Sequence, residues 1–149
     1  MSNGARHAIG VVIGLIVTPV IAGCLLYATN RLARYFLRYY AHGNDRWTAA
    51  ALLLAAAVVI GLVTGTRVSP LASLVPGAVF AAAGALWVVA PRWSIEHTAR
   101  KLPDDLDRGY QYLGPYGMLL VLGVALLVAS AAPSRWRAAT RAPRHGGPP

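Results

Sequence analysis

The chain has 149 residues, of which 56% are hydrophobic and only 13% charged, and its mean hydropathy is +0.51. Because soluble chains carry about 25% charged residues, this composition excludes an ordinary soluble domain and predicts an integral membrane protein. The net charge of +9 does not indicate a nucleic-acid partner, since the arginines flank apolar runs, where basic residues orient a chain in a bilayer.

Residues that bind metals or form disulfides are few and scattered. The single cysteine, Cys24, excludes an intramolecular disulfide framework, and the four histidines do not show the spacing of metal ligands. We therefore expect no metal, no cofactor and no catalytic site. The 13 arginines against one lysine indicate a GC-rich bacterial genome.

Four apolar runs cover residues 8–30, 47–65, 71–90 and 113–132. Each is long enough for the roughly 30 Å hydrocarbon core of a bilayer, which a helix crosses in about 20 residues. Lipid cannot hydrogen-bond an open strand, so we expect helices. The predicted fold is an all-α integral membrane protein with four transmembrane helices in two antiparallel hairpins.

The segments between and after the apolar runs predict how the helices are connected and where the transmembrane domain ends. Residues 65–70 are short and rich in turn formers, which predicts a tight hairpin of the second and third helices. Residues 1–132 should form the transmembrane domain. The Arg/Pro/Gly-rich tail, 133–149, has little apolar surface to bury and is expected to be disordered.

Orientation is not decided by basic residues, because six lie on the side of the termini and eight on the other. Nearly all Tyr and Trp residues lie toward the side of the two long connections, which predicts an aromatic belt there. The arginine-rich stretch after the fourth run favours cytoplasmic termini in the cell membrane.

Residues 21–24, Ile-Ala-Gly-Cys, follow an apolar stretch and resemble the lipobox of bacterial lipoproteins. The resemblance implies that Cys24 is lipidated and becomes a new N-terminus after cleavage. In the alternative interpretation Cys24 is a small buried side chain in a helix, because residues 25–27 continue the apolar run.

Small residues recur with a spacing of four, which lets transmembrane helices approach closely. They predict either packing within the bundle or a seam between subunits. The positions concerned are Gly10, Gly14, Ala57, Gly61, Gly65, Gly77 and Ala81.

A basic stretch follows the first run. Arg31, Arg34 and Arg38 share one helix face, which predicts contact with lipid headgroups or with an acidic partner.

The acids cluster in the last connection. Asp104, Asp105 and Asp107 could hold a cation, with Glu96 and His97 supplying acid–base chemistry, but Pro103 followed by acids is also typical of a helix start.

No ionisable side chain lies inside the four runs, although such groups are usual in ion-coupled transport. We therefore expect a non-enzymatic scaffold or accessory subunit, whose partners are the lipid bilayer and another membrane protein or a second copy. One alternative is a small transporter or channel subunit without intramembrane charges. The other is an interfacial enzyme that uses the acids and His97 of the last connection.

Overall fold

The computed structural model describes residues 3–37, 44–65 and 71–131, and within these ranges it contains helices and no strand. The all-helical prediction is therefore confirmed. The helices are α1 (Asn3–Leu37), α2 (Asp45–Gly65), α3 (Leu71–Val89), α4 (Pro91–His97), α5 (Asp104–Leu113) and α6 (Met118–Ala131). The predicted short turn, Arg38 and the tail 133–149 fall outside the described residues.

Within the described residues, three helices are long and apolar enough to cross a membrane, namely α1, α2 and α3, and the bent pair of α5 and α6 counts as a fourth span if it is taken as one. α1 has 35 residues and is longer than the apolar run 8–30. It continues to Leu37 because the residues that follow the run form an amphipathic extension without a proline or glycine. The composition of these helices supports a membrane-embedded protein.

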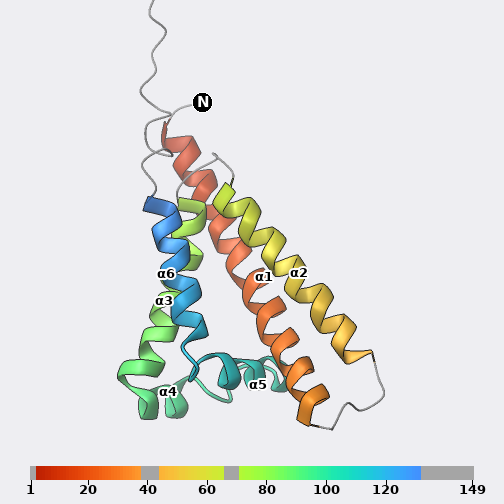
Figure 1. Cartoon of the computed structure of the whole chain (residues 1–149). Helices are drawn as coiled ribbons and strands as arrows, with labels where there is room; N and C mark the ends of the chain where they lie inside the picture. Colours follow the sequence, from red (N-terminus) through yellow and green to blue (C-terminus); the bar gives the residue numbers. More distant parts are fainter. Residues whose placement is uncertain (1–2, 38–43, 66–70, 132–149) are drawn as a thin grey trace, which may run out of the picture.

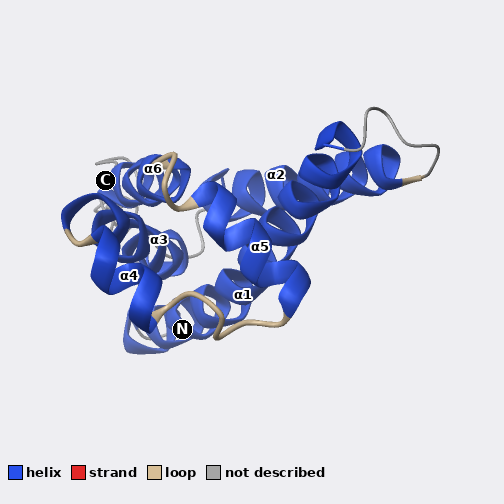
Figure 2. Cartoon of the chain, turned by 90° about the horizontal axis from the view of Figure 1, so that it is seen from below, coloured by secondary structure: helices blue, strands red, loops and turns tan. Residues whose placement is uncertain are grey.

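The helices form two arms, which we call the α1–α2 arm and the α3–α6 arm after the pairs with the most extensive contacts. The arms converge at the end where α1 begins and diverge toward the other end (Figure 1). α4 and α5 lie at this wide end, and α5 crosses from α6 to α1 (Figures 1 and 2). α2 and α3 have few contacts with each other, so the neighbours of α3 are α6 and α1.

Glycines bring α3 and α6 close together. A Cβ at Gly77 or Gly84 of α3 would collide with the backbone of α6, and one at Gly123 would collide with the backbone of α3. Such contact of backbones is how small residues stabilise helix pairs in lipid. The largest buried side chains lie around this arm and its contact with α1; they are Ile21, Leu26, Phe80, Trp87, Tyr110, Leu119 and Leu126.

The fourth apolar run differs from the expectation for residues 113–132. Leu113 ends α5, residues 114–117 form a turn, and α6 begins only at Met118, at an angle of 79° to α5. Pro115 has no N–H for a helical hydrogen bond, and Gly117 adopts a left-handed φ of 72°, which favours glycine. The 14 residues of α6 extend over only about 21 Å.

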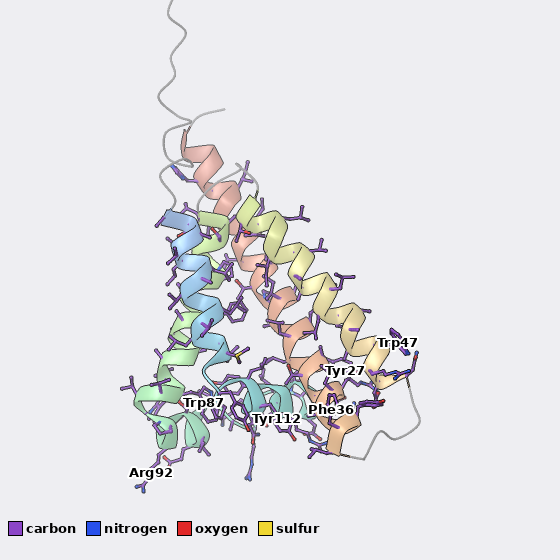
Figure 3. The ribbon with its side chains drawn as sticks, in the orientation of Figure 1. Tyr27, Phe36, Trp47, Trp87, Arg92 and Tyr112 are labelled. Carbon is purple, nitrogen blue, oxygen red and sulfur yellow. The ribbon has the colours of Figure 1, made fainter. Side chains whose placement is uncertain are left out.

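The connection 91–112 is mostly helical rather than a loop. α4 begins with Pro91 at its first turn, and α5 begins at Asp104, so the proline-and-acid pattern did mark a helix start. Aromatic side chains gather at this wide end, as expected for the predicted belt; Tyr27, Phe36, Trp47, Trp87 and Tyr112 are labelled in Figure 3.

Candidate functional site

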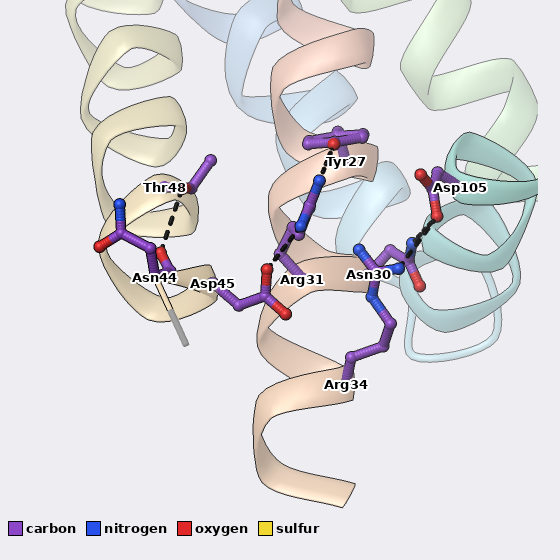
Figure 4. Close-up of polar contacts among 8 residues, drawn as sticks. All are labelled: Tyr27, Asn30, Arg31, Arg34, Asn44, Asp45, Thr48 and Asp105. Atoms are coloured by element: carbon purple, nitrogen blue, oxygen red, sulfur yellow. Dashed lines mark hydrogen bonds and ion pairs between the residues drawn. The ribbon is translucent and has the colours of Figure 1, made fainter. Parts of the chain in front are cut away.

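Polar side chains of α1, α2 and α5 meet at the wide end in a group that we call the polar junction (Figure 4). α1 contributes four of them with helical spacing, so that they share one face of its last turns. Asp45 comes from the first turn of α2 and Asp105 from the first turn of α5. The junction consists of Tyr27, Asn30, Arg31, Arg34, Asp45 and Asp105.

Arg31 connects α1 to α2. Its Nη1 lies 2.5 Å from Oδ1 of Asp45, and its Nη2 donates to the hydroxyl of Tyr27. The guanidinium carbon also lies 4.8 Å from the centroid of the Tyr27 ring. The side chains of Arg31 and Asp45 are 29% and 34% exposed, so this ion pair is only partly shielded from solvent.

Asp105 connects α5 to α1. Its Oδ1 accepts a 2.8 Å hydrogen bond from Nδ2 of Asn30 and lies 3.5 Å from Nη1 of Arg34. One turn further along α5, a Cβ at Gly109 would collide with the carbonyl group of Leu26. The carboxylate and the glycine therefore hold α5 directly against the backbone of α1.

Arg31 and Arg34, which were predicted to contact headgroups, thus each face an acid of the same chain. Nε and Nη2 of Arg34, Nε of Arg31 and Oδ1 of Asn30 are buried without a hydrogen-bond partner. Nε and Nη2 form the edge of a guanidinium that binds a phosphate or carboxylate through two hydrogen bonds. Because this edge is buried, contact with a headgroup requires the Arg34 side chain to turn outward.

The three acids of α5 face different surroundings. Asp104 is exposed, Asp105 belongs to the polar junction, and Asp107 is buried. Asp107 accepts a 2.6 Å hydrogen bond from the backbone N–H of Arg100, and a second from Gln111.

Asp107 stabilises the turn between α4 and α5. Arg100 has a φ of 63°, a left-handed conformation that costs a residue with a Cβ about 1 kcal/mol or more. Among the described residues, no group of three His, Cys, Asp or Glu side chains is placed to hold a metal ion.

Glu96 and His97 are exposed on α4. The His97 ring stacks on Trp93 with centroids 4.7 Å apart, and its Nδ1 lies 3.0 Å from the Trp93 carbonyl oxygen. The described contacts of His97 are therefore with its own helix.

The small residues divide into two sets. Gly14 faces Val75 and Ala72 of α3, Gly77 faces α6, and Ala81 lies opposite Gly123, while Gly10 is also buried. On α2, in contrast, Ala57, Gly61 and Gly65 are exposed, and a Cβ at Gly61 or Gly65 would meet no atom of the described residues within 4 Å. The same spacing therefore serves contacts within the chain on α1 and α3 but none on α2.

Cys24 lies within α1 as a free, half-buried cysteine, and the helix continues past it to Leu37.

Sequence reasoning missed several residues that shape the site. Asn30 and Tyr27 join the polar junction, and Asp45 supplies its second acid. Asn30 is the one amide near the end of an otherwise apolar run, and this could have marked it. Gly109 gives no such signal, because its role depends on where α1 lies.

No protein-family model, curated protein or solved structure matches this chain.

Proposed function

We propose that this chain is a non-enzymatic scaffold or accessory subunit of a complex in the bacterial cell membrane. It would cross the bilayer four times, as two antiparallel pairs, α1 with α2 and α3 with α6. Its partners would be lipid and another membrane protein or a second copy of itself.

The observation that carries this proposal is that the row of small residues on α2 is exposed. Every small residue predicted as a seam on α1 or α3 is at least partly buried. Ala57, Gly61 and Gly65 are exposed, and no other described residue lies within 4 Å of a Cβ built at either glycine. In lipid, apolar surface alone gives no incentive for association, so helices associate where small residues permit close packing. α2 is therefore the helix whose predicted row of small residues leaves room for a partner along its length.

Substitution on α2 tests the proposal. The variant Gly61→Leu should abolish self-association, or the retention of a co-purifying membrane protein, in mild detergent. Ala125→Leu, at an exposed small residue of α6, is the matched control and should change neither. Light scattering coupled to size exclusion, together with mass spectrometry of the retained proteins, measures both. An unsubstituted chain that purifies as a lone monomer contradicts the proposal.

The proposed topology places both termini in the cytoplasm and the polar junction outside. Single cysteines in a Cys24→Ser background test this, with Asn44→Cys and Asp104→Cys at the wide end and Gly65→Cys at the other. All three positions are exposed. A membrane-impermeant thiol reagent added to intact cells should label the first two positions and not the third. The reverse pattern would invert the orientation, and labelling at both ends would change the number of spans.

Contact of Arg31, Arg34 and Arg38 with anionic headgroups is part of the same proposal. It is supported by the position of Arg31 and Arg34 in the last turns of α1, and by the aromatic side chains labelled at the wide end in Figure 3.

A further inference from the structure

An apolar cavity of about 180 Å³ lies between the two arms. Side chains from both arms and from the junction of α5 and α6 form its wall. They are all aliphatic or thioether side chains, Leu25, Ile60, Leu113, Met118, Leu119 and Leu122.

The cavity is large enough for hydrocarbon and offers nothing to water. An engineered apolar cavity of about 150 Å³ stays dry and binds benzene. A water molecule needs two to four polar partners, and the side chains of this wall provide none. Its natural occupant is therefore an apolar group.

The cavity opens to the outside of the helix bundle. Met118 is 56% exposed, while Leu119, next to it in the sequence, is 3% exposed, so Met118 lies at the mouth and Leu119 at the floor. α2 and α6 have few contacts with each other, which leaves the space between the arms open on this side.

The depth of the cavity also fits a lipid chain. Leu25 precedes Asn30 of the polar junction by five residues, or about 8 Å along the helix, whereas Ile60 lies 15 residues, or about 22 Å, along α2 from Asp45. The lining residues therefore extend from near the polar junction deep into the apolar part of the bundle, which is the direction that a lipid chain takes.

We propose that this cavity binds the hydrocarbon chain of a bilayer lipid, which enters laterally between α2 and α6 past Met118. The inference goes beyond the scaffold function and does not use the outer face of α2. The bound hydrocarbon chain would fill the space that remains between the diverging arms.

Photolabelling of the full chain in nanodiscs tests the proposal, with one copy per disc and a phosphatidylcholine that carries a diazirine in one acyl chain. Val121 and Val128 of α6 are both 66% exposed and report the surrounding lipid at two depths. Leu119 and Leu126 are buried beside them, at 3% and 1% exposure, but only Leu119 lines the cavity. The labelling ratio of Leu119 to Val121 should exceed that of Leu126 to Val128, whereas equal ratios would overturn the proposal.

Filling the cavity provides the second arm of the experiment. Leu122→Trp should lower the Leu119 ratio to the Leu126 level. The matched variant Leu54→Trp, at a residue of α2 that is 67% exposed, should leave it unchanged. Labelling of Leu119 that persists in a folded Leu122→Trp chain would overturn the proposal, because the label would not come through the cavity. If Leu122→Trp does not fold, the ratios of the unsubstituted chain decide.

Discussion

The two arms use small residues in opposite ways. In the α3–α6 arm, Gly84 and Gly123 lie against the backbone of the facing helix. In the α1–α2 arm, Gly61 faces open space, and the described link at the wide end is the ion pair of Arg31 with Asp45. A row of small residues therefore marks a surface for close packing, but its spacing does not say whether the partner is the same chain.

The largest expected effect is at the glycines of the α3–α6 arm. Gly123→Val should lower the free energy of unfolding by about 1–3 kcal/mol or more, because the added side chain meets backbone that cannot move aside. Gly61→Val, the same change on the open face of α2, should stay within about 0.5 kcal/mol. Unfolding in detergent followed by tryptophan fluorescence measures both. Equal losses of unfolding free energy in the two variants would show that the glycines of the two arms are packed alike.

The link between α5 and α1 should follow in size. Asp105→Ala leaves Nδ2 of the buried Asn30 without its acceptor, and an unsatisfied buried donor costs about 1–3 kcal/mol. The pair with Arg34 adds less, because the Asp105 side chain is 41% exposed. Asp104→Ala is the control, because it removes an equal charge from the same helix start but from an exposed position. Hydrogen exchange should accelerate across α5 in the first variant only. Similar exchange in both variants would assign the effect to the charge of the helix terminus.

A smaller effect is expected for the ion pair between α1 and α2. A double-mutant cycle with Arg31→Ala and Asp45→Ala should give a coupling energy of about 0.2–1 kcal/mol, since both side chains remain partly exposed. The coupling should decrease with added salt. A coupling energy larger than the loss of unfolding free energy in Asp105→Ala would reverse the expected order of strength of the two links.

The smallest effect on stability is expected for a substitution of Cys24, which is half-buried and free.

The same residue decides whether the chain is processed. We expect the intact mass of the chain, purified from bacterial membranes, to include residues 1–23, because α1 continues through Cys24 and its earlier residue Gly14 packs on α3. A mass that lacks these residues and carries acyl chains would establish the lipoprotein interpretation instead. Cys24→Ser would then restore the longer chain.

Much of the helical structure follows from local pattern. The apolar runs of α2 and α3 predict their helices closely, and Pro103 with its acids marks the start of α5. The turn at residues 114–117 was readable in principle, since Pro and Gly interrupt the fourth run, but hydrophobicity alone concealed it.

The candidate site was harder to predict. Arg31 and Arg34 were recognised as one basic face, yet their acidic partners come from α2 and α5, and Asp105 is 71 residues away from Arg34 in the sequence. The apolar cavity gave no sequence signal, because its six side chains are ordinary members of apolar helices.

Composition and local pattern are enough to predict a helical membrane protein, because few charges and long apolar runs leave helices as the structure that satisfies the backbone in lipid. They do not indicate which small residues are buried, which acids the arginines meet or where the arms diverge. These depend on how helices pack against one another. Hydrophobic periodicity is weak evidence for that packing when nearly every side chain of a helix is apolar.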